Sequence, residues 1–433
     1  MRAGGKALDP VISVLVGLQT IALLLCLAAC GGSSGTTTLK SGTLTAVAFS
    51  SYRALDGSDA VNTDQPNGEL PVSNIWTINS DGSGLTAITE LSGSAHGADS
   101  IQPQWSPDGT KVVYSSGRAL DGSDAAGVGP NIWVSNADGS GATPLTQLAV
   151  YAPCYGPVWS PDGTKIAYYS WRSLDGSNTE EGGENAPRNI WVVNADGSND
   201  IPVTQLTASG ADSFTPVWSP DGTKLAFYSG RALDGSNAGP GEYAAQNVWV
   251  INADGSGATP ITHIADELGS YQNPLWSRDG TMVIFNSYIP SPSADDIWSA
   301  HPDGSALTQI THTSPALAYA TDWSPEGSTM LYGSSVATDG SNSPSQSLNI
   351  WTMNADGSGQ TPLTKLNNAS AYPGAWSPDG TRIVYLSERA FDGSDNQDTN
   401  SVLNVWLMQA DGSGSVPLTT LTKADSNFPA WKP

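Results

Sequence analysis

A tight-turn motif that returns in every copy of a long repeat constrains the fold of this chain more than any other feature. The motif is Trp-Ser-Pro-Asp-Gly, complete in four copies and altered in two more. The copies begin at Trp105, Trp159, Trp218, Trp276, Trp323 and Trp376, and a truncated copy ends at Trp431. Successive tryptophans are 54, 59, 58, 47, 53 and 55 residues apart. Repeats near this length with four strand-like segments are typical of the blades of a β-propeller.

Each copy contains four short segments rich in β-branched and aromatic residues. In the copy around Trp105, we expect strands ending at Trp105 and spanning 111–116, 131–136 and 143–148. Tight turns join the first strand to the second and the third to the fourth, because Pro presets φ and Gly accepts a positive φ. The sequence therefore predicts an all-β chain.

The two ends of the repeat array do not match. A strand of the type Ile/Val-Trp occurs seven times, at Trp76, Trp133, Trp191, Trp249, Trp298, Trp351 and Trp406. The first copy begins at its second strand, 45–50, and the last segment, 428–431, supplies a first strand. We therefore predict a seven-bladed β-propeller of four-stranded blades, closed by the C-terminal strand completing the first blade. Closure removes the open sheet edges of a linear array.

The N-terminus has the pattern of an export signal. Arg2 and Lys6 precede an apolar run, 11–29, which ends Leu-Ala-Ala directly before Cys30. This run resembles the bacterial lipoprotein signal, and the resemblance implies that Cys30 is lipidated. A Gly/Ser/Thr-rich tether follows. We expect a signal peptide at 1–29, a tether at 30–43 and the propeller at 44–433, with a lipid anchor to the cell envelope, periplasmic or surface-facing, as its only membrane contact.

The charge of the chain limits its partners. The formal net charge is −24, and loss of 1–29 makes it −25. Such a surface repels phosphate backbones, so nucleic acid is excluded as a partner. After removal of the signal and lipidation of Cys30, only Cys154 remains, so no intramolecular disulfide is expected and packing must supply stability.

Together the Trp-Ser-Pro-Asp-Gly and Asn-Ala-Asp-Gly-Ser-Gly turns resemble the TolB-type, WD-like propeller repeat of bacterial envelope proteins, across almost the whole mature chain. TolB joins a six-bladed propeller to an N-terminal α/β domain, whereas this chain has seven copies and a tether. The resemblance therefore implies the fold and not membership of the Tol–Pal system. Related repeats also precede the hydrolase domain of prolyl-peptidase-like enzymes, and no such domain follows here.

We expect ligand binding on the face that carries the loops from second to third strands and from fourth strands to the next blade, because these loops hold nearly all the length variation. Fourteen of the fifteen tryptophans occupy the two repeated strand positions and are expected to pack between blades. Trp171 is the exception. It stands just before such a loop, and Tyr52 and Tyr288 take its place in two other copies.

Two repeated sets of side chains are candidates for the ligand site. The first is an arginine at the position that follows Trp171 and its equivalents in other copies. These arginines could form a partial guanidinium ring for an acidic ligand or pair with aspartates of their own or a neighbouring loop: Arg53, Arg118, Arg172, Arg231 and Arg389. The second is an aromatic residue shortly before the first strands, which could stack on sugars, grip a peptide or pack between blades: Tyr155, Phe214, Tyr271, Tyr319 and Tyr372.

Catalytic and metal-binding signatures are weak. A Gly-x-Ser-x-Gly match at 31–35 lies in the tether, and the four histidines are scattered. The Asp-Gly-Ser-Asp loops supply too few oxygens for Ca²⁺, so calcium is only a minor alternative and no other metal or cofactor is expected. We expect a monomeric, non-catalytic envelope lipoprotein that binds an envelope protein or a surface glycan. The alternatives are a carbohydrate-active enzyme (a polysaccharide lyase or hydrolase) that uses loop-face carboxylates, and a calcium-dependent adhesion module.

Overall fold

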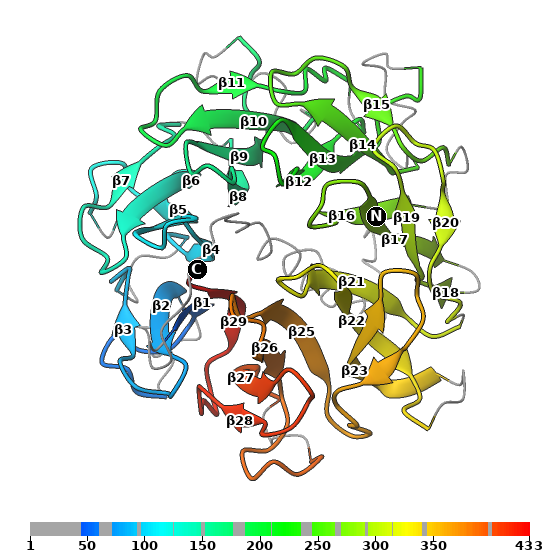
Figure 1. Cartoon of the computed structure of the whole chain (residues 1–433). Coiled ribbons are helices and arrows are strands. Elements are labelled where there is room, and N and C mark those ends of the chain that lie inside the picture. Colours follow the sequence, from blue (N-terminus) through cyan, green and yellow to red (C-terminus); the bar gives the residue numbers. More distant parts are fainter. Residues whose placement is uncertain are drawn as a thin grey trace, which may run out of the picture.

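The computed structural model shows a closed ring of seven antiparallel sheets around a central axis (Figure 1). It describes residues 45–59, 72–92, 97–123, 125–148, 152–175, 187–208, 210–234, 245–264, 270–290, 293–313, 315–339, 344–396 and 401–433. The predicted signal peptide, tether and Cys30 lie outside these residues. No helix long and apolar enough to cross a membrane occurs in the described part of the chain.

Every blade has four strands that follow one another from the inner to the outer edge of the sheet, and blade 5 has a fifth, β18 (Ser293–Ala294), beside its second strand. Blade 1 contains β29 (Ser426–Trp431), β1 (Ala46–Ser51), β2 (Asn74–Asn79) and β3 (Thr86–Ala87), and blade 2 contains β4 (Ser100–Trp105), β5 (Lys111–Arg118), β6 (Ala126–Asn136) and β7 (Thr143–Pro144). Blade 3 contains β8 (Cys154–Trp159), β9 (Lys165–Ser170), β10 (Asn189–Asn194) and β11 (Ile201–Pro202), and blade 4 contains β12 (Ser213–Trp218), β13 (Lys224–Ser229), β14 (Asn247–Asn252) and β15 (Thr259–Pro260). Blade 5 contains β16 (Ser270–Trp276), β17 (Val283–Pro290), β19 (Ile297–Ala300) and β20 (Thr308–Gln309), with β18 (Ser293–Ala294) beside β17. Blade 6 contains β21 (Ala318–Trp323), β22 (Thr329–Val336), β23 (Pro344–Asn354) and β24 (Thr361–Pro362), and blade 7 contains β25 (Ala371–Trp376), β26 (Arg382–Ser387), β27 (Asn404–Gln409) and β28 (Val416–Pro417).

The ring closes through the C-terminal strand, as the sequence predicts. β29 lies beside β1, with Val47 opposite Trp431 and Ser51 opposite Ser426 (Figure 1). Beyond the strand, Lys432 N donates to Ala46 O at 2.8 Å. The seven-bladed, closed fold class is therefore confirmed.

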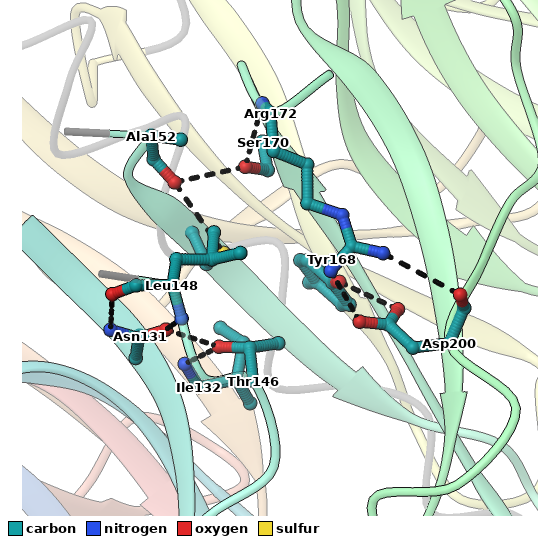
Figure 2. Close-up of polar contacts among 10 residues, drawn as sticks. Asn131, Ile132, Thr146, Leu148, Ala152, Tyr168, Ser170, Arg172 and Asp200 are labelled. Carbon is teal, nitrogen blue, oxygen red and sulfur yellow. Dashed lines mark hydrogen bonds and ion pairs between the residues drawn. The ribbon is translucent and has the colours of Figure 1, made fainter. Parts of the chain in front are cut away.

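The fourth strands are shorter than the sequence predicts, because beyond their second residue side-chain hydrogen bonds take the place of the backbone hydrogen bonds of a regular strand pair. In blade 2, pairing stops at Pro144, and Thr146 Oγ accepts a hydrogen bond from Ile132 N at 2.9 Å (Figure 2). The buried Asn131 amide then bonds Thr146 Oγ and both backbone groups of Leu148. The same Asn and Thr pair recurs in blades 1, 3, 4, 6 and 7, and Asp296 replaces the Asn in blade 5. Such fully bonded polar groups fix the register of the outer strand.

Neighbouring blades are joined by the tryptophans of the inner strands. At five of the seven blade junctions the indole Nε1 donates to a carbonyl of the preceding inner strand at 3.1 to 3.3 Å: from Trp105, Trp159, Trp218, Trp276 and Trp431. At the other two, among the described residues, the buried Nε1 atoms of Trp323 and Trp376 have no hydrogen-bond partner.

An ion pair with a buried carboxylate lies at these two junctions. Arg278, which replaces the proline of the turn motif, bonds both Asp322 Oδ1, at 3.0 Å, and Trp323 O, at 2.8 Å. Asp322 Oδ2 accepts a bond from Trp376 N at 2.9 Å. Blades 5, 6 and 7 are thus linked by one carboxylate and one guanidinium. Burial raises the pKa of Asp322 to about 6, although Arg278 lies beside it.

Cys154 is buried and forms no disulfide. Burial raises the pKa of its thiol to about 12. Because the thiolate is the reactive form, this thiol is chemically inert.

Candidate functional site

Aromatic side chains gather at the junction of blades 3 and 4. Tyr155 belongs to β8, Tyr169 to β9 and Phe214 to β12, and Trp171 follows β9 directly. Tyr155 meets Trp171 edge to face with ring centres 6.0 Å apart, and Tyr169 meets Phe214 in the same way at 5.9 Å. Tyr155 and Tyr169 join the two pairs, with ring centres 6.0 Å apart. Two of the sequence-predicted aromatics, Tyr155 and Phe214, thus lie together with Trp171.

One arginine bridges the two ends of this row of rings. The guanidinium of Arg188, just ahead of β10, lies 4.1 Å from the centre of the Trp171 ring and 4.8 Å from that of Phe214. Its Nη1 pairs with Asp212 Oδ2 at 3.3 Å, and its backbone N donates to Asp212 Oδ1 at 2.7 Å. We call Tyr155, Tyr169, Trp171, Phe214 and Arg188 the aromatic–arginine cluster.

The cluster remains partly open to solvent. The side chains of Arg188 and Asp212 are 29% and 23% exposed, and all five cluster residues are only partly buried. Trp171 marks the end of the second strand, where the chain enters the loop to the third strand, so the cluster belongs to the loop face. Indole, phenol and guanidinium groups are the side chains that contribute most to binding at protein interfaces. A guanidinium held over aromatic rings is oriented in advance and still has edge N–H groups for an incoming acceptor.

The five repeated arginines do not converge on one site. Each guanidinium lies over the third-strand tryptophan of its own blade, 3.5 to 5.3 Å from the ring centre, and each of these tryptophans is at most 2% exposed. Arg53, Arg172, Arg231 and Arg389 are buried, and burial lowers the pKa of Arg53 and Arg231. Their repetition therefore reflects blade packing by cation–π contacts.

The side-chain hydrogen bonds of Arg53, Arg118 and Arg172 also stay within the blade. Arg53 donates to Gly57 O and Arg118 to Gly122 O, which are backbone atoms of their own loops. Arg172 instead pairs with Asp200 Oδ2 at 2.5 Å, and Tyr168 Oη donates to Asp200 Oδ1 at 2.7 Å (Figure 2). Burial raises the pKa of Asp200, and the Arg172 charge opposes that shift.

The other predicted aromatics lie away from the cluster. The second set occupies the second place of the inner strands rather than the stretch before them. Tyr319 and Tyr372 are buried in the core at 9% and 8% exposure, and Tyr271 packs on Phe285 and Trp298 of its own blade. Tyr52 packs against a small apolar cluster of blade 7, Val402, Leu421 and Ala424. Tyr288 lies in β17 opposite Ser270.

Sequence reasoning missed Arg188 and Tyr169. A signal for Arg188 does exist: the residue before the Asn or Asp that opens the third-strand motif is Ser73, Pro130, Gln246, Asp295, Leu348 or Leu403 in the other copies. A cation occurs there in blade 3 alone. No group of three or more His, Cys, Asp or Glu side chains that could hold a metal ion occurs among the described residues.

Comparison with known proteins agrees with the repeat analysis. No family model matches the chain. It is 29% identical over 128 residues to the uncharacterized peptidase YuxL of Bacillus subtilis, and the matched stretch covers 30% of this chain and 16% of that protein. It is 28% identical over 121 residues to the Tol-Pal system protein TolB of Anaeromyxobacter sp. (strain K), and the matched stretch covers 27% of this chain and 21% of that protein. The chain thus matches about a fifth of the length of these relatives.

A solved structure shares the fold. An oligogalacturonate lyase from Vibrio parahaemolyticus superimposes with a TM-score of 0.52 at 16% identity, over 77% of this chain and 82% of the lyase. At this identity the likeness concerns the propeller fold alone.

Proposed function

We propose that this TolB-like propeller is a non-catalytic binding protein of the bacterial cell envelope that holds a partner protein on its loop face through the aromatic–arginine cluster. The observation that carries the proposal is the half-buried cluster itself, with Arg188 set between Trp171 and Phe214. The TolB relatives supply the envelope setting, and the signal-like N-terminus is consistent with it.

A protein partner fits the cluster better than a glycan does. Tryptophan, tyrosine and arginine together are the composition of interface hot spots. One face of Trp171 is already covered by Arg188, which leaves this ring less surface for stacking on a sugar. An acidic or carbonyl-rich peptide segment could accept from the guanidinium while its apolar side chains contact Tyr155 and Phe214.

The test compares two tryptophans that differ in burial. Trp171→Ala removes a partly exposed ring and should cost little stability, whereas Trp191 is 1% exposed, so Trp191→Ala should cost about 3 to 5 kcal/mol. The full-length protein and the Trp171→Ala, Arg188→Gln and Trp191→Ala variants are cross-linked in the native envelope, and captured proteins are identified by mass spectrometry. The proposal expects a partner lost with Trp171→Ala and with Arg188→Gln, at nearly unchanged melting temperatures.

Two results would contradict the proposal. Retention of every captured protein by both cluster variants would remove the cluster from the interface. Binding to a glycan array or cleavage of polyuronides would instead favour the carbohydrate alternatives, which the fold shared with the oligogalacturonate lyase keeps open.

A further inference from the structure

A pocket lies at the outer rim of the ring, where the fourth strand of blade 6 meets the outer part of blade 7. It encloses about 580 Å³. Its walls come from the chain after β24, the loop after β26 and the tight turn before β28: residues 363–366, 389, 393, 395, 412, 414 and 415. The charged side chains among them are Lys365, Arg389 and Asp395. We call it the rim pocket.

Arg389 differs from the other repeated arginines in its hydrogen bonds. In blades 1 to 3 the guanidinium donates to a loop carbonyl or to Asp200. Arg389 Nε is buried without a partner, and no described residue accepts a bond from its Nη atoms or forms an ion pair with it. The carboxylates of its loop, Asp392 and Asp395, accept from backbone N–H groups instead. Arg389 is only 8% exposed, and its guanidinium lies 4.4 Å from the centre of the Trp406 ring, which holds it in place.

Blade 3 shows how the same set of side chains holds a carboxylate. Tyr168 lies in β9 opposite Trp191, and Arg172 follows it by four residues. Arg172 Nη1 pairs with Asp200 Oδ2 at 2.5 Å, and Tyr168 Oη donates to Asp200 Oδ1 at 2.7 Å (Figure 2). Asp200 stands directly before β11, the outermost strand of its blade. A tyrosine and an arginine in this register therefore form a carboxylate seat at the rim.

Blade 7 repeats the two donors without the carboxylate. Tyr385 lies in β26 opposite Trp406, Arg389 follows it by four residues, and the residue directly before β28 is Ser415. Tyr385 Oη is buried and has no hydrogen-bond partner of normal geometry among the described residues. Burial raises the pKa of Tyr385, and the Arg389 charge and the Ser415 hydroxyl oppose that shift, so both groups lie close to the phenol. Where blade 3 has Asp200, blade 7 thus has a short side chain at the wall of the rim pocket.

We propose that the rim pocket binds a carboxylate group of another molecule, in the place that Asp200 has in blade 3. The carboxylate pairs with Arg389 and accepts from Tyr385 Oη, and Lys365 adds a second positive charge to the pocket lining. The chain itself selects this ligand, because the equivalent donors of blade 3 hold a carboxylate. The site belongs to blades 6 and 7 and does not depend on the aromatic–arginine cluster of blades 3 and 4.

The test measures binding to the full-length protein by ligand-detected NMR titration at low salt. Succinate represents a free organic acid, N-acetyl-aspartic acid N-methylamide represents an aspartyl side chain of a protein, and succinamide is the neutral control. A single guanidinium at an open pocket should give a Kd of about 1 mM for the acids. The neutral amide should not bind. Tighter binding of one acid over the other assigns the source of the carboxylate.

Two variants test the named donors and the seat. Tyr385→Phe removes one hydroxyl and should raise the Kd about fivefold. The fold tolerates this change, because phenylalanine already lies opposite the third-strand tryptophan in blades 1, 4 and 5. Ser415→Asp supplies the carboxylate that blade 3 has, so it should abolish binding of both acids and raise the melting temperature by about 2 °C.

Val416→Asp is the matched control for the added charge. Val416 is 48% exposed, and successive side chains of a strand point to opposite faces, so this carboxylate should leave binding and melting temperature unchanged. Equal loss of binding with Ser415→Asp and Val416→Asp would reduce the effect to charge repulsion and overturn the proposal. Retention of binding by Ser415→Asp, or no binding of either acid to the unmodified protein at ten times the expected Kd, would overturn it as well.

Discussion

Removal of Arg278 should extend the pH dependence of the propeller's stability to higher pH. Asp322 is 2% exposed and has Arg278 as its charged partner. In Arg278→Met, the stem of the side chain is kept and the charge is lost. The carboxylate then stays buried between blades with only backbone N–H groups from Trp323 and Trp376 to stabilise its charged form.

The sign of the effect follows from the pKa of Asp322, which burial raises from 3.8 to about 6. The folded protein therefore holds a proton that the unfolded chain releases, and stability falls as pH rises between these two values. Without Arg278 the folded pKa moves above 6, and the fall extends to higher pH. At pH 8 the variant should lose about 3 to 5 kcal/mol, the cost of a buried charge without its partner. At pH 5, where the carboxyl is mostly protonated, the loss should be about 1 kcal/mol, from the missing bond to Trp323 O.

Urea denaturation of both proteins at pH 5 and pH 8 measures this difference. Asp295, whose pKa burial raises to about 7, titrates in both proteins and cancels in the comparison. Arg278→Met combined with Asp322→Asn is the matched control, because a neutral amide oxygen can still accept from Trp376 N. The double variant should recover most of the loss at pH 8. An equal loss at both pH values, or no recovery in the double variant, would refute the reasoning.

Two further predictions concern the ends of the chain. Deletion of Phe428–Pro433 removes most of β29, including Trp431, whose indole bonds Ala375 O at 3.1 Å, so cooperative thermal unfolding should be lost. A truncated protein that melts like the full chain would contradict strand closure. Cys30→Ser should leave an unlipidated precursor, and mass spectrometry of the mature N-terminus checks this. An unmodified N-terminus at another residue would end the anchoring hypothesis.

The fold could be predicted from the sequence because each blade repeats the same local chemistry. Trp-Ser-Pro-Asp-Gly marks the first turn, and the seven Ile/Val-Trp strands set the blade count. The unmatched ends then left one arrangement that pairs all strands, which is the observed pairing of β1 with β29. The short outer strands were missed because hydrophobic pattern alone does not show that Thr146 Oγ accepts the bond of Ile132 N.

The candidate site was predicted less well, because long side chains can turn in several directions. Trp171 could be singled out as the tryptophan outside both packing positions, and the structure places it in the cluster. The arginine that follows it, Arg172, has the same sequence pattern as a ligand site, yet its guanidinium lies 3.5 Å from the centre of the buried Trp191 ring. Nothing in the pattern says whether a guanidinium faces solvent or an indole of its own blade.

Departures from the repeat are more informative than the repeat itself, provided that their partners are known. Arg278 departs from the consensus proline, and Asp322 from the mostly apolar position before the next tryptophan. The structure explains both at once, because they join blades where the Trp323 and Trp376 indoles lack a bond among the described residues. Arg188 also departs from its repeat and also has a carboxylate partner, Asp212, but this pair is partly exposed and lies beside aromatic rings. The carboxylate of the first pair, Asp322, is 2% exposed and accepts bonds from two neighbouring blades, so this pair contributes to the ring itself. In the second pair both Arg188 and Asp212 are partly exposed and the guanidinium lies over Trp171 and Phe214, and for that reason we propose that the partner binds at Arg188.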